Sequence, residues 1–387
     1  MIIAKDEEEE EMNCAILTFH GADNYGSVLQ AYALMKSIRA NCDCEIINYI
    51  PAHQKELYAV YLPANNIKNI VKNTRAFMFR KMLEDRKNRF SDFRRTILEI
   101  IDGEEIEDSK RLNEYLNTFD AVVCGSDQIW NPKSIDFSEE FFLPKYKGRK
   151  IAYAPSFGNA KVADFGNRAE YISSKIKDFD YISIRESSGL GMLRNLGVKN
   201  DVTAVLDPTL LLTAKQWDAL TLHEEENNRV EEKYIFFYSI DYNQEAIDMV
   251  ERISHLSGLP VKIIFSTNKT YKAIHKFHLV KETSPLDFLK LIKNSELVLS
   301  TSFHGVAFST IYRKKFYALE SKRGNDWYCD ERIHSLLLKY KLNDRILRKP
   351  DVEKLDWNRI RDIHYDENLI KECISNSKRY IEMALRG

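Results

Sequence analysis

Short apolar runs, each long enough for one strand, alternate along this chain with longer stretches of helical periodicity. Most of the runs end in a polar or glycine-containing turn, and apolar residues then recur at helical spacing. This alternation predicts parallel sheets with helices on both faces. The predicted strands are Cys14–Phe19, Glu45–Tyr49, Phe119–Cys124, Lys150–Ala154, Tyr181–Ile184, Val202–Leu206, Lys233–Ile240, Val261–Phe265, Glu296–Ser300 and Phe316–Leu319.

The second half of the chain repeats the strand-and-helix plan of the first half. Helical spacing covers Ser27–Arg39, Gln244–Ser257, Pro285–Asn294, Ile333–Lys341 and Asn368–Leu385. The length of 387 residues suits two domains, and the turn Asp207-Pro208-Thr209 is the best candidate for their junction. We therefore expect a GT-B-like α/β fold, with two Rossmann-type domains facing across a cleft and a C-terminal helix. The expected parts are a disordered acidic leader at 1–12, an N-terminal domain at 13–204, a C-terminal domain at 205–347 and a helical tail at 348–387.

Composition excludes several classes of protein. The formal net charge of -1 argues against bulk affinity for nucleic acid, because a basic face is needed to neutralise phosphates. The 6 cysteines are scattered and have the spacing of neither a metal site nor a disulfide framework. The acidic start is not a signal peptide, and no later apolar run approaches the length that a bilayer needs. We expect a cytoplasmic protein without a metal or a cofactor.

One stretch, Ile67–Leu98, is strongly basic and amphipathic, with aromatic residues such as Phe77, Phe90 and Phe93 on its apolar side. A basic amphipathic helix can lie on an anionic membrane surface. An ordinary solvated helix face is the alternative. The stretch is thus a candidate for peripheral contact with the inner face of the membrane.

His304 occupies the most suggestive place for chemistry. It follows the hydroxyls of Ser300, Thr301 and Ser302 at the end of an apolar run, where a helix begins. Ligands of open α/β sheets bind at the carboxyl ends of strands, and helix N-termini favour anions. A histidine gives or takes protons near neutral pH. We therefore expect His304 to act in acid–base catalysis, against the alternative of a capping role.

Polar groups at other strand ends complete the candidate site. Asp127 follows a Gly-Ser turn and could accept a hydrogen bond from a sugar hydroxyl or act as a base; an Asx-turn is the alternative. Arg185 ends an apolar strand, where its charge needs an anion or a structural pair with Glu186 or Asp207. Trp130 could stack on a sugar ring, although core packing is commoner. The remaining candidates are Asn24, Gly26, Ser126, Ser302, Phe303 and Arg332.

These motifs, in their order and spacing, resemble the polysaccharide pyruvyl transferase family from Cys14 to about Leu347. The residues that carry the resemblance are Phe19–Ser27 (FHGADNYGS), Val123–Asn131 (VCGSDQIWN), Ala154–Gly158 (APSFG), Ser183–Ser188 (SIRESS), Leu206–Thr209 (LDPT), Ser300–Gly305 (STSFHG) and Arg332–Leu337 (RIHSLL).

The resemblance implies an enzyme that places a pyruvate ketal on a sugar, with phosphoenolpyruvate as the donor. It implies that Arg185 and the region around His304 contact the donor, and that Asp127 faces the acceptor. The acceptor would be a sugar of a cell-surface polysaccharide or of its precursor, free or lipid-linked. Some family members have arginine where this chain has Ser302, so Arg332, Lys322 or Arg323 would have to supply the second phosphate anchor.

Two other functions remain open from the sequence. A GT-B glycosyltransferase that uses a nucleotide sugar would have the same two-domain plan. A non-catalytic, glycan-binding relative would keep the fold, and Ser302 in place of arginine is the feature that favours it. A nucleotide site in the C-terminal domain would indicate the first, and sugar binding without turnover the second.

Overall fold

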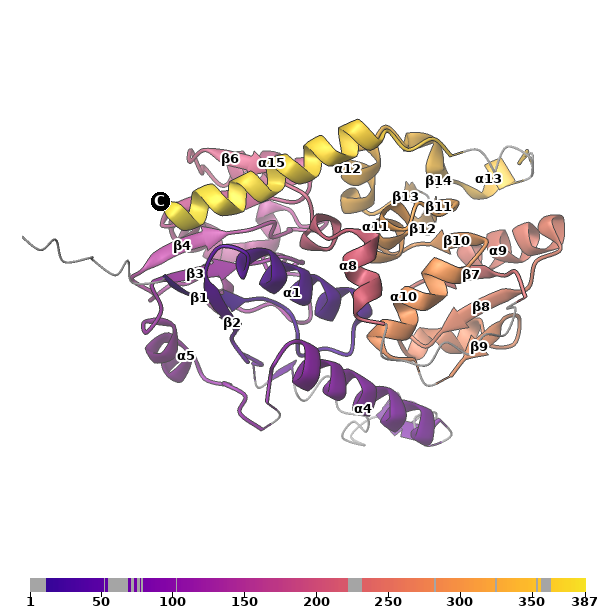
Figure 1. Ribbon diagram of the computed structural model, residues 1–387, viewed down its shortest axis with the longest axis horizontal. Coiled ribbons are helices and arrows are strands. Elements are labelled where there is room, and N and C mark those ends of the chain that lie inside the picture. The colour runs from indigo at the N-terminus through magenta and orange to yellow at the C-terminus, as the bar shows by residue number, and fades with distance from the viewer. Residues whose placement is uncertain are drawn as a thin grey trace, which may run out of the picture.

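The computed structural model describes residues 12–387 except 52, 55–68, 71–72, 75–76, 78, 102, 222–231, 282, 324–325, 353 and 356–362. In this part of the chain, two six-stranded parallel sheets lie side by side, each flanked by helices (Figure 1). The predicted α/β plan with two Rossmann-type halves and a C-terminal helix is confirmed. The acidic leader falls outside the described residues except for Met12, and the predicted domain limits remain a prediction.

The first sheet has the strand order β2-β1-β3-β4-β5-β6. Every neighbouring pair is parallel, with Cys14 opposite Cys44 on one side of β1 and Ala121 on the other. Its strands are β1 (Asn13–Leu17), β2 (Asp43–Ile46), β3 (Ala121–Cys124), β4 (Arg149–Ala152), β5 (Tyr181–Ile184) and β6 (Val202–Ala204). The helices of this half are α1 (Tyr25–Ile38), α4 (Arg80–Ile97), α5 (Ser109–Leu116), α6 (Ala169–Lys177) and α7 (Ser187–Asn195).

The second sheet has the order β14-β11-β10-β7-β8-β9 and is also parallel throughout. Its strands are β7 (Ile235–Tyr238), β8 (Val261–Ile264), β9 (His278–Val280), β10 (Leu297–Ser300), β11 (Phe316–Leu319) and β14 (Ile346–Leu347). The helices are α8 (Ala214–Ala219), α9 (Gln244–Ser257), α10 (Pro285–Asn294), α11 (Phe303–Ile311), α12 (Glu331–Lys339), α13 (Lys349–Val352) and α15 (Glu367–Arg386).

The sequence signals for helix ends explain several of these bounds. Asn24 caps α1 by accepting from the backbone N–H groups of Gly26 and Ser27. Ser284 and Asp287 form a capping box at the start of α10, directly before Pro285. Between β11 and α12, the short strands β12 (Ser321–Arg323) and β13 (Asp326–Tyr328) pair as an antiparallel hairpin.

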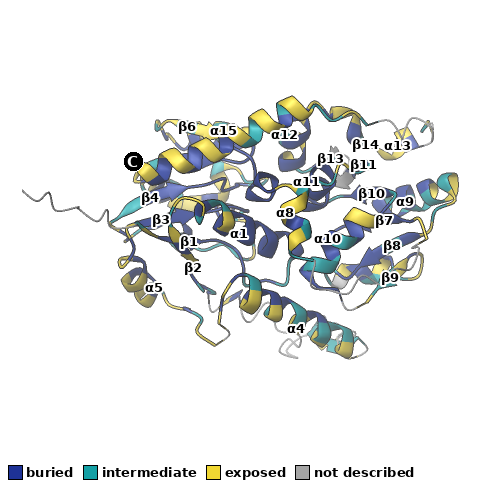
Figure 2. Ribbon diagram, viewed as in Figure 1, coloured by how far each residue is buried: buried dark blue, intermediate teal, exposed yellow. Residues whose placement is uncertain are grey.

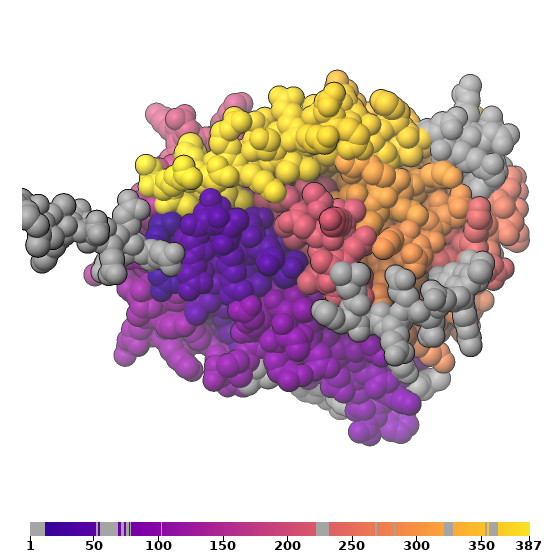
Figure 3. Space-filling view, in the orientation of Figure 1, coloured from indigo at the N-terminus to yellow at the C-terminus, as the bar shows by residue number. Residues whose placement is uncertain are grey.

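The C-terminal helix α15 returns from the second half to the first. Leu206 N–H donates to Ser377 Oγ at 3.0 Å, and Arg149 donates to the carbonyl of Leu385. Figure 1 shows α15 lying along the molecule from α12 to β4, and Figure 3 shows it covering both halves. The helix therefore ties the two halves together on one face.

One side of helix α4 is buried against the rest of the protein, and the other side is exposed. Arg86, Phe90, Phe93 and Arg94 are its buried residues, whereas Lys81, Lys87 and Arg95 are among the exposed ones. Figure 2 shows this division between a teal-to-blue inner side and a yellow outer side. Among the described residues, no helix has the length and apolar character needed to cross a bilayer.

Candidate functional site

The turn after β10 places His304 in the first turn of α11. Ser300 fixes this turn, because its Oγ donates to the carbonyl of Tyr238 at 2.8 Å and accepts from Ser302 N–H at 3.0 Å. The His304 side chain is buried, and its Nε2 has no hydrogen-bond partner. Nε2 lies 3.9 Å from Oδ2 of Asp207. An unpartnered buried nitrogen is costly unless a ligand satisfies it.

The room for the His304 ring comes from Gly26 on α1. A Cβ atom at Gly26 would lie 1.9 Å from His304 Nδ1, far inside van der Waals contact. The two halves of the protein thus meet where a helix of one half has no side chain. The glycine is needed for this close approach rather than for an unusual backbone conformation.

We expect Gly26→Ala to lower turnover by about 10²-fold, because the imidazole must move and catalytic groups tolerate little displacement. Gly191→Ala is the matched control, since Gly191 lies in α7 and a Cβ there would meet nothing within 4 Å. The control should leave turnover unchanged and the fold as stable or slightly more stable. Steady-state kinetics and thermal unfolding of both variants measure this. Equal activity of the two variants would mean that the ring position is unimportant.

Asp127 follows β3 and lines the same cavity as His304. Its φ of 71° is in the left-handed region, which aspartate tolerates better than most residues. Ser27 Oγ donates to its Oδ2 at 2.9 Å, and Arg332 and Arg185 approach its Oδ1 at 3.5 and 3.6 Å. Burial alone would raise the pKa of Asp127, but the charges of Arg185, His304 and Arg332 outweigh it and lower the pKa. Asp127 is thus ionised at neutral pH.

Arg185 lies behind Asp127 and is paired. Its Nη1 is 2.5 Å from Oδ2 of Asp207, which also accepts from Ser126 Oγ at 3.2 Å. Nε and Nη2 of Arg185 are buried without hydrogen-bond partners. The structural pair with Asp207 therefore exists, and the role of Arg185 as a donor anchor stays a prediction.

Arg332 is brought to Asp127 from the start of α12. Asp330 caps that helix and accepts from Arg332 Nε at 2.8 Å and Nη2 at 2.6 Å. Although burial alone would raise it, the pKa of Asp330 is about 2 because Arg332 is adjacent. The Phe303 ring lies 4.7 Å from the Arg185 guanidinium and 5.6 Å from that of Arg332. Phe303 thus packs against both cations.

A cavity of about 260 Å³ lies between the two halves at these strand ends. Of the predicted site residues, Asn24, Asp127, Ser302, His304 and Arg332 line it. Gly26 and Ser126 do not line this cavity: Gly26 lies against His304, and Ser126 donates a hydrogen bond to Asp207. Arg185 and Phe303 border a separate small void of about 10 Å³. The structure therefore brings all nine residues into one cluster, but only five of them face the cavity.

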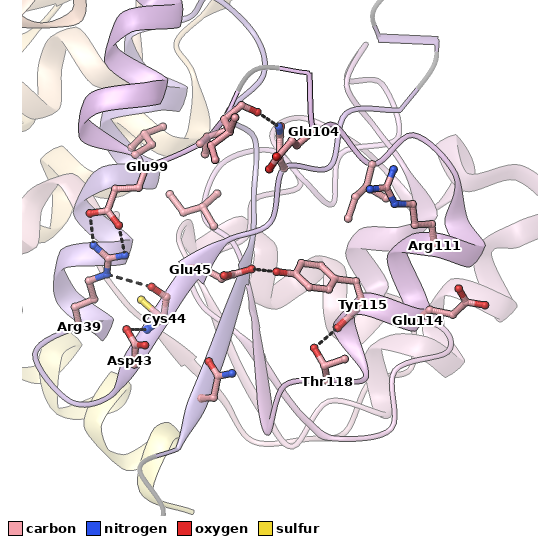
Figure 4. A pocket seen from close by; sticks show the side chains of 17 residues that line it. Arg39, Asp43, Cys44, Glu45, Glu99, Glu104, Arg111, Glu114, Tyr115 and Thr118 are labelled. Atoms are coloured by element: carbon pink, nitrogen blue, oxygen red, sulfur yellow. Dashed lines mark hydrogen bonds and ion pairs between the residues drawn. The ribbon is translucent and has the colours of Figure 1, made fainter.

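A larger cavity of about 1040 Å³ lies elsewhere, at the start of β1 and along β2, beside α5 (Figure 4). Figure 4 shows two pairs among its polar groups, Arg39 with Glu99 and Glu45 with Tyr115. None of the predicted site residues lines it. We therefore place the candidate site in the smaller cavity, where buried ionisable groups converge.

Several residues of the cluster were not predicted as site residues. Asp207 was considered only as the domain junction and as a structural partner of Arg185, yet it contacts Arg185, Ser126 and Thr209 while facing His304. The sequence signal that could have identified Asp207 as a site residue is its position directly after the predicted strand Val202–Leu206. The other missed members are Ser27, Asp330 and Arg86, whose positions depend on contacts between distant segments.

Trp130 does not face the cavity. It is fully buried, donates from Nε1 to the carbonyl of Phe141 at 3.2 Å and packs on Phe142, Phe157 and Phe179. Stacking on a sugar ring is excluded by this burial, so the core-packing alternative is correct. The side chains of Lys322 and Arg323, proposed as phosphate anchors, lie outside the described residues.

Comparison with known proteins gives a family and a fold. The family model described as polysaccharide pyruvyl transferase matches residues 24–323. No curated protein matches the chain. A solved UDP-GlcNAc 2-epimerase from Methanocaldococcus jannaschii, in complex with UDP-GlcNAc and UDP, is similar at 14% identity and a TM-score of 0.55, covering 97% of this chain and 100% of that one. The Neisseria meningitidis UDP-GlcNAc 2-epimerase bound to UDP-GlcNAc is similar at 11% identity and a TM-score of 0.53, covering 97% and 99%. These likenesses support the GT-B-like fold and nothing beyond it.

Proposed function

This chain belongs to the polysaccharide pyruvyl transferase family, and from that premise we propose that it transfers pyruvate from phosphoenolpyruvate to a sugar of a cell-surface polysaccharide or its precursor, forming a ketal. The observation that carries the proposal is the arrangement around His304. A buried histidine with an unpartnered Nε2 faces a cavity that the guanidinium of Arg332 also lines. A proton donor beside a fixed cation suits an anionic enol ester.

The chemistry divides into steps that these residue types can perform. Protonation of the methylene carbon by His304 turns the enol carbon into an electrophile. One sugar hydroxyl then attacks that carbon, phosphate leaves with the electrons of its C–O bond, and a second hydroxyl closes the ketal. The balance is one phosphate released for each ketal formed. Asp127 faces the same cavity and is the proposed acceptor of a proton from a sugar hydroxyl.

No metal or cofactor is part of this proposal, and phosphoenolpyruvate is a substrate. A lipid-linked acceptor, a cytoplasmic location and peripheral membrane contact through residues 67–98 remain predictions. Lys81, Lys87 and Arg95 are among the exposed basic residues of α4 that are available for such contact.

The test is the coupling of phosphate release to sugar modification. With a panel of galactosides, mannosides and glucosides, we expect phosphate release only when phosphoenolpyruvate and an acceptor are both present. The modified sugar should gain the mass of a pyruvate ketal, and blocking either hydroxyl should abolish the product. Phosphate release without sugar modification would contradict the proposal.

The alternative of a nucleotide-sugar transferase has support from the fold, because similar structures were solved with UDP-GlcNAc. It predicts release of a nucleotide and indifference to phosphoenolpyruvate. Thermal unfolding separates the two, since a ligand at about 100 times its dissociation constant adds roughly 2.7 kcal/mol of stability. Stabilisation by nucleotide sugars but not by phosphoenolpyruvate would favour this alternative.

A further inference from the structure

We propose that Arg86 on α4 binds one oxyanion end of the three-carbon donor in the cavity that His304 and Arg332 also line. This inference rests on the proposed function for the identity of the donor. It gives the basic stretch 67–98 a role inside the protein that its sequence did not indicate.

Arg86 is a buried cation at the wall of the cavity. It is 8% exposed and lines the same cavity as His304 and Arg332. Its Nη2 donates to the backbone carbonyl of Asp23, and its Nε is buried without a hydrogen-bond partner. Burying a guanidinium is costly unless an anion compensates the charge.

The carboxylate nearest to Arg86 is already engaged by another arginine. Asp23 Oδ1 accepts from Arg94 Nη1 at 3.1 Å, whereas the closest approach of Arg86 Nη1 to Asp23 Oδ2 is 3.9 Å. Arg94 is buried as well, at 9% exposure. Among the described residues, two buried guanidinium groups therefore share the single carboxylate of Asp23. One positive charge is left over beside the cavity.

The Arg86 side chain is held in place by aromatic rings from both halves. The guanidinium carbon is 4.7 Å from the centre of the Phe90 ring, 5.4 Å from that of Tyr25 and 5.9 Å from that of Phe265. Tyr25 in turn bonds to Thr283 Oγ1 at 2.6 Å across the cleft. A cation fixed by stacked rings is preorganised and loses little side-chain entropy when it binds an anion.

Asp127 and Asp136, the other carboxylates that line the described part of the cavity, already have partners. Asp127 is flanked by Arg332 and Arg185, and Asp136 accepts a hydrogen bond from Gln54 Nε2 at 2.7 Å. The cavity of about 260 Å³ has room for a small phosphate ester with two anionic ends. Arg86 and Arg332 line this one cavity, so a single ligand there can contact both.

Calorimetric titration of phosphoenolpyruvate into the full-length protein without acceptor tests the inference. We expect Arg86→Met to weaken binding by about 10- to 100-fold, the loss typical of a charged hydrogen bond, and Arg86→Lys by less. Arg95→Met removes a charge from the outer face of the same helix, where Arg95 pairs with Asp92, and should leave binding unchanged. Titrations with inorganic phosphate and with pyruvate identify the end that Arg86 holds, because only the affinity for that ligand should fall.

Arg94→Met is the control for a purely structural effect, since Arg94 shares Asp23 but does not line the cavity. It should destabilise the fold as much as Arg86→Met does while weakening donor binding by less than about threefold. Equal losses of donor affinity in both variants, unchanged affinity in Arg86→Met, or no binding to the wild-type protein would each overturn the inference. Sugar modification is measured separately, so Arg86-dependent donor binding without ketal formation would reject only the proposed function.

Discussion

Replacing His304 by alanine is expected to lower ketal formation by about 10²-fold or more, because positioned proton transfer contributes about 10²–10⁴-fold to a rate. The side chain is buried against Gly26, faces Asp207 and lines the cavity, so its loss would remove the proposed proton donor. The fall should appear in kcat more than in the affinity for the donor. His304→Gln, which keeps most of the volume, should be as inactive as His304→Ala.

The pH dependence of the wild-type enzyme tests whether His304 acts as the proton donor. Burial lowers the pKa of His304 below its usual 6.5, although the carboxylates of Asp207 and Asp127 act in the opposite direction. If His304 donates the proton, kcat/KM for the donor should fall as the pH rises through this lowered pKa. The donor brings negative charge, so the corresponding pKa in kcat should be higher.

His334→Ala is the matched control, because His334 is exposed on α12. It should leave both the rate and the pH profile unchanged. If His304→Ala retained activity within a few-fold, or if kcat/KM rose with pH in this window, His304 would not be the acid.

Replacing Asp207 by asparagine should lower the free energy of unfolding by about 3–5 kcal/mol, because it takes from the buried charge of Arg185 its closest carboxylate and leaves only Asp127, at 3.6 Å. Asp207 is 1% exposed and lies 2.5 Å from Arg185. Asparagine has nearly the same shape, so the loss reports the charge rather than a cavity. Urea unfolding at pH 7 measures it.

Glu367→Gln is the control, since Glu367 forms a two-point ion pair with Arg313 on the surface. Such exposed pairs contribute at most about 1 kcal/mol. The double variant Asp207→Asn/Arg185→Met should recover part of the lost stability, because it also removes the buried charge of Arg185. If Asp207→Asn and Glu367→Gln lowered the free energy of unfolding by similarly small amounts, the buried Asp207–Arg185 pair would not have the expected effect on stability.

Acid unfolding should distinguish the same variants. Burial alone would raise the pKa of Asp207, but Arg185 and His304 lower it below its usual 3.8. A carboxyl whose pKa is lower in the folded state contributes stability above its unfolded pKa and loses that stability as the pH falls through the folded value. The wild-type protein should therefore lose stability below about pH 3.8 more steeply than Asp207→Asn.

The apolar runs and helix caps were enough to predict most of the secondary structure. The bounds of α9, α10 and β11 agree with the predictions residue for residue, because local periodicity and capping set them. The strands β9 and β14, of three and two residues, were missed. Such short strands have too little alternation to be distinguished from loops, and the rest of their sheet selects them.

The sequence by itself determined which polar residues stand at strand ends, and thus predicted His304, Asp127 and Arg185 as parts of one site; Arg332 was added from the start of the helix that follows a charged stretch. In a parallel sheet the carboxyl ends of all strands lie at the same edge, so residues that directly follow different strands are brought close together. Only the tertiary structure decided which of them face the cavity. Arg185 is turned away by its pair with Asp207, while Arg86 reaches the cavity from a helix that the sequence placed on the surface. Side-chain direction and charge pairing depend on segments far apart in the chain, such as Asp23 with Arg94, and no local pattern encodes them.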